Sequence, residues 1–162
     1  MIDLESSRTT TIFTDDDPTH YIDLGVTKDK KYLIIASNTK EDSEVWVLPR
    51  DVASNETVVT PTLLVSRQRE VKAHIDHVRD FFVTITTDDK NAQDYRIASL
   101  SDTKFGKHSK SDWQDLLDPE LFRDKELVIT EFDCFEKFIA LYVKIDGKPD
   151  VLIYDLEAKK SQ

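Results

Sequence analysis

The sequence contains one short group of residue types that bind metals or transfer protons. His74, Asp76 and His77 lie within four consecutive positions of an alternating segment, VKAHIDHV. Imidazole nitrogens and carboxylate oxygens are common ligands of divalent metal ions. In an extended strand, however, side chains alternate between the two faces, so histidines three positions apart point in opposite directions. The segment therefore predicts an inner strand with one histidine beside a wet channel, and no metal site.

The one cysteine, Cys134, is a second candidate for chemistry. A reactive cysteine needs a nearby cation or helix N-terminus to stabilise its thiolate. The neighbours of Cys134 are Phe132, Asp133 and Phe135, an aromatic and acidic setting that favours the thiol. We therefore expect a buried, inert side chain. A lone cysteine cannot form an internal disulfide, which favours a reducing compartment and predicts a cytoplasmic protein.

Two acidic runs and three glycines are further features that could take part in chemistry. The runs Asp15–Asp17 and Asp88–Asp89 lack the EF-hand pattern of alternating acidic residues, glycine and terminal glutamate, so solvated turns are predicted. A serine hydrolase presents its nucleophile on a strained Gly-x-Ser-x-Gly turn. Gly25, Gly106 and Gly147 lie far apart, so this turn cannot be written. The sequence thus assigns no catalytic, cofactor-binding or metal-binding residue, and predicts no cofactor.

The overall charge excludes several function classes. The 162 residues include 22 Lys and Arg against 32 Asp and Glu, a formal net charge of −10. Nucleic-acid binding needs Lys and Arg gathered on one face, so an acidic chain without a basic cluster is a poor candidate. The chain also lacks an apolar run of the roughly 18 residues that a membrane helix requires. The first residues are neither basic nor apolar, so we expect no secretory signal.

The elements that would position these residues are short strands separated by polar turns. Runs rich in β-branched and aromatic residues are typical of strands. They occur at Tyr32–Ser37, Val45–Leu48, Phe81–Thr87, Leu127–Thr130, Phe138–Val143 and Val151–Leu156. The best helical candidate, Ser111–Arg123, is broken by Pro119 and is predicted to be an outer strand followed by a loop.

These strands repeat along the chain. Three segments, residues 21–51, 71–102 and 127–159, each contain an alternating strand, a charged turn, an apolar strand, a polar turn and a third strand. The apolar strand recurs at Leu33, Phe82 and Phe138, a period of about 50 residues. Outer strands are predicted at Thr62–Ser66 and Trp113–Leu117. A further one, at Thr9–Thr14, would belong to a unit that starts upstream.

Four antiparallel strands at this period predict an all-β protein built of consecutive β-propeller blades. The predicted division is residues 1–17 as a leading outer strand and linker, 18–66 as blade 1, 67–118 as blade 2, and 119–162 as an incomplete blade 3. The middle strands of such blades are buried on both faces, which explains their continuous apolar character. The alternative is a single antiparallel sandwich or barrel.

About three blades form an incomplete ring, since propellers typically close with four to eight. The end blades would expose apolar faces, which favour association. Either the chain self-associates to complete a ring, or it is a piece of a longer protein. The sequence starts inside a unit and stops at Gln162 before a fourth strand of the third unit, so we expect the second alternative.

The first third of the chain resembles a known family. Residues 16–48 contain an Asp-Asp-Pro lead, an aromatic strand at Tyr21 and a Thr-Lys-Asp turn at residues 27–29. A strand ending in Ser37-Asn38 and the sequence Ser43-Glu44-Val45 follow. This stretch resembles the N-terminal propeller of prolyl oligopeptidase-family serine peptidases, with oligopeptidase B and the prolyl endopeptidase-like proteins as the nearest branch. Residues 80–87 and 113–117 match more loosely, and the last third matches only in its strand pattern.

The resemblance implies a lid over an α/β-hydrolase domain that carries a Ser-Asp-His triad. Such a lid admits short peptides and excludes folded proteins. The expected function is therefore a fragment of a non-catalytic, substrate-gating propeller, and the expected partners are the catalytic domain and passing peptides. None of the catalytic part lies in these residues, so the chain alone should be inactive. The alternative is a stand-alone interaction module that closes its ring by self-association.

Overall fold

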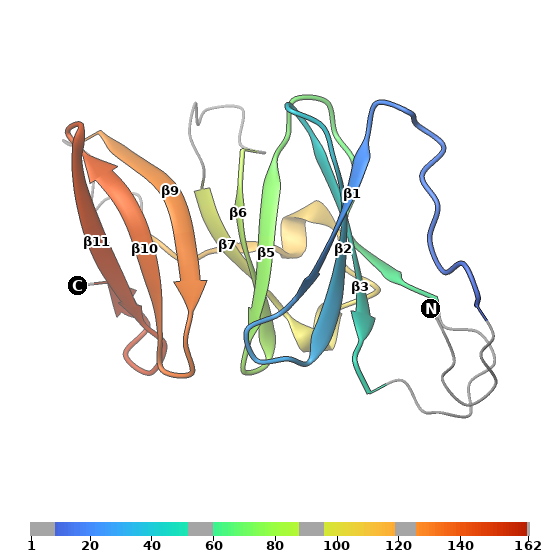
Figure 1. Cartoon of the computed structure of the whole chain (residues 1–162). Coiled ribbons are helices and arrows are strands. Elements are labelled where there is room, and N and C mark those ends of the chain that lie inside the picture. The colour runs from blue at the N-terminus through green and yellow to red at the C-terminus, as the bar shows by residue number, and fades with distance from the viewer. Residues whose placement is uncertain (1–8, 52–59, 88–95, 119–125, 162) are drawn as a thin grey trace.

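A computed structural model of the chain describes residues 9–51, 60–87, 96–118 and 126–161. The regular structure of these residues consists of strands and two 3₁₀ turns, η1 (Asp102–Lys104) and η2 (Lys110–Asp112). The strands form three separate four-stranded antiparallel sheets, each built from consecutive segments of the chain. The all-β prediction is confirmed, and three separate sheets replace the alternative of a single sandwich or barrel (Figure 1).

Each sheet is a meander, so strand order in space follows strand order in the sequence. The first sheet contains β1 (Tyr21–Val26), β2 (Tyr32–Asn38), β3 (Ser43–Pro49) and β4 (Thr62–Val65). The second contains β5 (Ala73–Val78), β6 (Phe81–Thr86), β7 (Arg96–Ser101) and β8 (Gln114–Asp115). The third contains β9 (Leu127–Cys134), β10 (Phe138–Ile145), β11 (Lys148–Asp155) and β12 (Lys160–Ser161).

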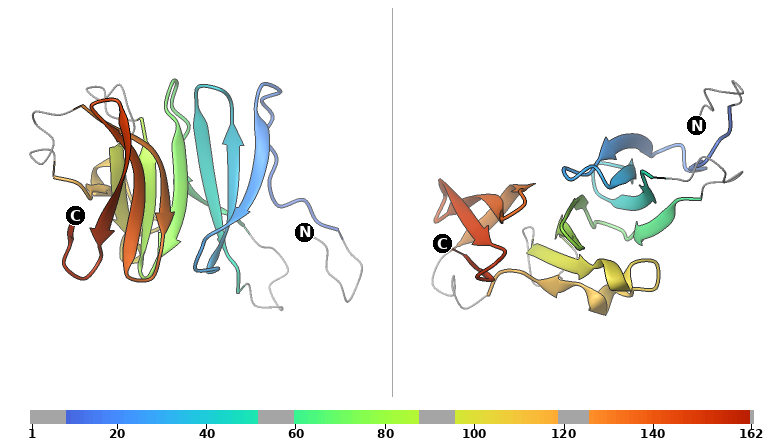
Figure 2. Two further views of the ribbon diagram at one scale, coloured as in Figure 1. Left: turned by 60° about the vertical axis from the view of Figure 1, so that its left-hand side comes forward. Right: turned by 90° about the horizontal axis from the view of Figure 1, so that it is seen from below.

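The three sheets follow one another around an arc and leave the ring open (Figure 2, right). They lie within the predicted ranges 18–66, 67–118 and 119–162, although the exact blade boundaries remain a prediction. Tight turns at positive φ connect the first two strands of the first and second sheets, with Lys30 at φ 63° and Arg79 at φ 57°. Asp146 and Gly147 form the predicted turn between β10 and β11, both at positive φ.

The second sheet is packed on both faces. In β6, Phe82 faces the first sheet, and Val83 and Ile85 face the third. All three side chains are at most 1% exposed. Burying such a side chain stabilises the fold by roughly 1.5–3 kcal/mol, so the two interfaces dominate the packing energy. This explains why the apolar strand does not alternate with polar residues.

Two apolar clusters correspond to the two interfaces. The cluster between the first and second sheets is centred on Val47, Leu64, Phe82 and Leu100, with Tyr32 and Phe105 packed against it. The larger cluster between the second and third sheets contains Val78, Val83, Ile85, Ile97, Ile129, Cys134, Ile139, Leu141, Val143, Tyr154 and Leu156.

Two strand predictions are wrong in detail. The segment 9–14 forms only an isolated bridge at Thr9, because Phe13 packs across the first sheet against Trp46, with ring centroids 5.7 Å apart. The third sheet does have a fourth strand, the two-residue β12, which pairs with Tyr154 and Asp155 of β11.

The outer strand of the second sheet is also shorter than predicted. In place of Trp113–Leu117, β8 spans only Gln114–Asp115. The residues before it form η2, where the Asp112 carboxylate accepts a hydrogen bond from the Ser109 amide at 2.8 Å. A side chain that satisfies a backbone donor in this way favours a turn over an extended strand.

Candidate functional site at the joints between the sheets

The three inner strands, β1, β5 and β9, each lie at one edge of their sheet. A groove of about 410 Å³ lies between β5 and β9, lined by polar side chains that include His74, Asp76, Glu131 and Asp133. The inner-strand position predicted for the VKAHIDHV segment is therefore correct. All six residues of β1 are exposed, and Leu24 is 79% exposed.

The turn between β1 and β2, residues 27–31, is rigidly built. The Thr27 hydroxyl donates to the Asp29 carboxylate at 2.8 Å and accepts from the Tyr32 amide at 3.1 Å. The Lys30 amide donates to the Thr27 carbonyl at 2.8 Å. We call residues 27–31 the mouth turn. Because its backbone is fixed from inside, the side chains and amides of this turn are presented at defined positions.

The mouth turn binds the second sheet through three contacts. The Lys28 amide donates a hydrogen bond to the Asp76 carboxylate at 2.8 Å, and the Asp29 carboxylate lies within hydrogen-bond distance of the His77 ring. The Lys31 ammonium donates to the carbonyl oxygen of Arg79. The sequence offered no signal for these pairings, because each joins residues 48 positions apart.

His77 is the most buried charged or titratable group at this joint, with a side chain 0% exposed. Its Nδ1 lies 2.6 Å from Oδ2 of Asp29 in the mouth turn. Its Nε2 lies 2.9 Å from Oδ1 of Asp102, which follows β7. The rings of Tyr32 and Phe82 lie edge-on to the imidazole, with centroids 4.9 and 4.7 Å away. His77 was not predicted to carry partners, so its role was missed.

The same turn reaches the third sheet. The Lys28 ammonium forms an ion pair with Asp133 of β9 and lies 5.4 Å from the centroid of the Phe135 ring. The hydrogen bond to Asp133 raises the pKa of Lys28. From the second sheet, the Arg79 Nε donates to the Glu136 carbonyl at 2.6 Å. The contacts of the mouth turn and of Arg79 therefore connect all three sheets on the side of the molecule where these residues lie.

Cys134 is buried at the joint between the second and third sheets, as predicted. It is 3% exposed and belongs to the larger apolar cluster. Burial, and after it the nearby Asp76 carboxylate, raises the pKa of the Cys134 thiol well above its usual range. A thiol with a raised pKa is a poor nucleophile.

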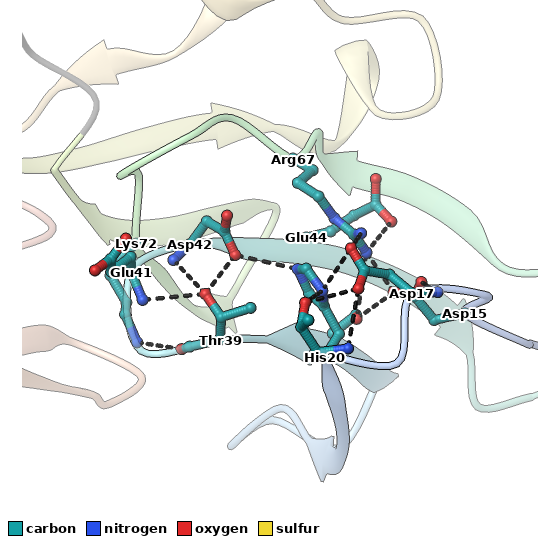
Figure 3. Close-up of polar contacts among 11 residues, drawn as sticks. Asp15, Asp17, His20, Thr39, Glu41, Asp42, Glu44, Arg67 and Lys72 are labelled. Carbon is teal, nitrogen blue, oxygen red and sulfur yellow. Dashed lines mark hydrogen bonds and ion pairs between the residues drawn. The ribbon is translucent and has the colours of Figure 1, made fainter.

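A second polar network fixes the segment before β1 (Figure 3). The Asp15 carboxylate accepts from the Ser37 hydroxyl at 2.5 Å and forms an ion pair with Arg67. Arg67 also lies 3.5 Å from a carboxylate oxygen of Glu44 and 3.7 Å from one of Asp17. The Asp15 side chain is 10% exposed, so the prediction of a solvated turn is wrong for this residue.

The physical reason for this correction is that Arg67 lies within the acidic group. Hydrogen bonds from Ser37, from the Asp17 amide and from Arg67 hold the pKa of Asp15 at about 2. On the other side of the same network, His20 Nε2 lies 3.1 Å from Oδ1 of Asp42. The second acidic run, Asp88–Asp89, lies outside the described residues.

The described residues contain no group of three or more His, Cys, Asp or Glu side chains placed to hold a metal ion. His74 is exposed and His77 is enclosed by two carboxylates, so the two do not converge. None of the helices in the described part of the chain is long and apolar enough to cross a membrane. The joints are built from hydrogen bonds and ion pairs between sheets.

Comparison with known families supports the β-propeller architecture. The sequence profile of the family described as "Prolyl oligopeptidase, N-terminal beta-propeller domain" matches residues 1–162. The chain belongs to this family. The resemblance inferred from the sequence is thereby confirmed, and the three sheets are blades of this propeller family.

Individual relatives agree with the family assignment. The chain is 28% identical over 122 residues to the protein named "Prolyl endopeptidase-like" from Gallus gallus, which covers 70% of this chain and 16% of that protein. Its fold matches oligopeptidase B from Trypanosoma brucei with covalently bound antipain, with a TM-score of 0.73, 23% identity, and coverage of 93% of this chain and 20% of that chain.

A second structural relative is prolyl oligopeptidase B from Galerina marginata bound to a 35mer substrate. It has a TM-score of 0.70 and 15% identity, and the match covers 93% of this chain and 20% of that chain. At these identities the likeness shows the fold. The chain spans a fifth or less of the length of these relatives.

Proposed function

We propose that this chain is part of the substrate-gating propeller of a serine oligopeptidase that cleaves short peptides. Its partner is an α/β-hydrolase catalytic domain of the same protein. The family assignment over all 162 residues supports this proposal, as does the presence of a propeller and a catalytic domain in full-length relatives. A cytoplasmic location is part of the proposal and is supported by the single buried cysteine.

The observation that carries the proposal is the reach of the mouth turn. Lys28 of the first blade extends past the second blade to Asp133 of the third. Lys28 and Asp133 both line the groove between β5 and β9, so their ion pair spans this groove. A gate of this kind admits chains whose width fits the opening and resists wider ones.

The first experiment is to sequence the mature transcript beyond the codon for Gln162. Further four-stranded units, followed by a Gly-x-Ser-x-Gly motif, are expected. A stop codon directly after Gln162 would overturn the proposal. The 162-residue chain by itself should not hydrolyse short peptidyl substrates. Turnover that persists through repurification and is abolished by a serine-directed inhibitor would contradict this expectation.

The second experiment tests gating in the full-length product. Lys28→Ala should raise the ratio of kcat/KM for a longer peptide to kcat/KM for a short one, because the mouth loses its bridge. Lys107→Ala changes an exposed lysine in the loop after η1 and is the matched control. An unchanged ratio in Lys28→Ala would contradict the gating role and leave the family assignment intact.

Exposed apolar residues at both ends of the arc favour one alternative, a module that closes its ring by self-association. Ile22, Leu24 and Val26 are 46%, 79% and 50% exposed at one end, and Tyr142 and Val151 are 39% and 48% exposed at the other. The net charge of −10 opposes association of identical chains. Light scattering distinguishes the two: a stable closed dimer of the natural full-length product favours the module.

A further inference from the structure

His77 lies between two carboxylates that belong to different blades. Asp29 projects from the mouth turn of the first blade, and Asp102 follows β7 in the second. The two ring nitrogens lie 2.6 and 2.9 Å from the carboxylate oxygens, which is hydrogen-bond distance on both sides. The side chain is 0% exposed, so water does not supply these bonds.

The geometry constrains where the protons lie. A neutral imidazole has one N–H donor, whereas an imidazolium has two. An ionised carboxylate only accepts hydrogen bonds, so a neutral ring would place a nitrogen lone pair against one of the carboxylates. A ring with protons on both nitrogens satisfies both contacts, as charge-assisted bonds of the stronger kind.

The contacts of Asp29 decide against a proton on the Asp29 carboxyl group. Its Oδ1 already accepts from the Thr27 hydroxyl at 2.8 Å and from the Lys31 amide at 3.1 Å. Burial alone would raise the pKa of Asp29, but the hydrogen bonds from His77, Lys31 and Thr27 outweigh it and hold that pKa below its usual value. Asp29 is therefore an ionised acceptor.

We propose that His77 is a doubly protonated clasp between the first and second blades, and that loss of one ring proton loosens this joint. The clasp lies beside the aromatic packing of Tyr32 against Phe82, whose ring centroids are 4.8 Å apart across the joint. When the ring becomes neutral, one of the two bonds turns into a contact between a lone pair and an anion, which is repulsive.

Other charged groups surround the clasp from each packed element. From the mouth turn, the Lys31 ammonium lies 3.7 Å from Oδ2 of Asp29. The Lys28 amide donates a hydrogen bond to Asp76, the residue before His77. From β5 itself, the Asp76 carboxylate accepts a hydrogen bond from the His77 amide at 2.8 Å. The charged side chain of Arg79 lies two positions after His77 in the sequence. From β2, Tyr32 has a pKa raised by burial and by the charges of Asp102 and Asp29.

Nuclear magnetic resonance of the ¹⁵N-histidine-labelled chain tests the protonation state. At about pH 6, near the middle of the range in which histidine ordinarily changes charge, both ring nitrogens of His77 should carry protons. His77→Gln assigns the signal, and His74→Gln, which changes the exposed histidine of the same strand, is the control. A single unprotonated ring nitrogen in folded protein at this pH overturns the proposal.

A second measurement tests the coupling between proton and joint. As pH rises and the ring loses its second proton, the cross-blade Overhauser contact between Tyr32 and Phe82 should weaken in step. The stacked pair Phe135 and Phe138 in the third blade, with centroids 4.7 Å apart, is the internal reference and should not change. A constant Tyr32–Phe82 contact through the titration overturns the proposal.

Asp102→Asn keeps the proposal testable if His77→Gln does not fold. The asparagine Oδ1 retains an acceptor but removes one flanking charge, so the second ring proton should leave at lower pH than in the wild type. Asp112→Asn removes a carboxylate from η2 in the same blade and is the matched control. Loss of the proton at an unchanged pH in Asp102→Asn contradicts the clasp.

Discussion

Lys28 and Asp133 lie 105 positions apart in the sequence, and their ion pair joins the first blade to the third. The Lys28 amide simultaneously binds Asp76 of the second blade at 2.8 Å. One residue therefore contacts three sheets, with its backbone on one side and its side chain on the other. Sequential blades normally contact only their neighbours, so this pair adds a connection that the repeat alone does not require.

The Lys28–Asp133 pair should contribute modestly to stability and should weaken with salt. The side chains are 50% and 29% exposed, and exposed pairs typically couple by about 0.2–1 kcal/mol. A double-mutant cycle of Lys28→Ala and Asp133→Asn, followed by urea unfolding, measures the coupling. Lys107→Ala is the control. The coupling energy should decrease when the salt concentration is raised from about 0.05 M to about 1 M. A coupling energy that stays constant over this range contradicts an ionic origin.

Asp15→Asn should flatten the acid branch of the stability curve. The native pKa of Asp15 is held at about 2, below the ordinary aspartate value of 3.8, so its charged form is favoured by folding. The stabilisation is complete above the unfolded pKa and is lost as pH falls from about 4 to about 2. Urea unfolding across this range measures the slope, which should be shallower in the variant than in the wild type.

Asp16→Asn is the control for this prediction, since it changes the neighbouring carboxylate. If Asp15→Asn and the wild type lose stability equally between about pH 4 and pH 2, the network around Arg67 does not stabilise the ionised form.

Cys134 should resist thiol reagents in the folded chain and react after unfolding. The side chain is 3% exposed, and burial holds its pKa well above the usual value. The thiolate is the reactive form, so both factors slow alkylation. Mass spectrometry after brief exposure to iodoacetamide, with and without urea, gives the comparison. Rapid alkylation of the folded chain would contradict the buried position.

Phe82→Ala should remove about 3–5 kcal/mol of unfolding free energy, because a buried phenylalanine leaves a cavity when it is truncated. Phe82 is 0% exposed, between the first and second blades. Phe135→Ala changes a ring that is 43% exposed and should cost far less. Circular dichroism during urea unfolding measures both. Equal losses would place the stabilising contacts outside the blade interface.

The fold was predictable because its signals are local and repeated. The apolar runs at Tyr32, Phe81 and Phe138 each mark the second strand of a sheet, and their spacing revealed the blades. Two of the three strand errors have simple physical causes. Phe13 packs onto Trp46 instead of continuing a strand, and the two residues of β12 are too few to leave a signal.

The joints were not predictable, because they depend on how blades are placed in space. His77 was correctly assigned to an inner strand, but its partner Asp29 lies 48 positions away in the turn between β1 and β2. The same is true of Asp15, whose fate depends on Arg67, 52 positions later. A single sequence contains no pattern that pairs such residues. The partners of buried polar side chains can be identified only when the arrangement of the blades in space is known.

The second sheet has no free face, and this limits how the array can grow. A fourth unit cannot insert beside β6, so every addition must occur at the outer surfaces of the first or third sheet. An arc of this kind therefore keeps two cohesive ends, whatever the number of its units, and only joining one end to the other removes both. A cut before β9 would not reduce that number, because Val83 and Ile85 would become a new end.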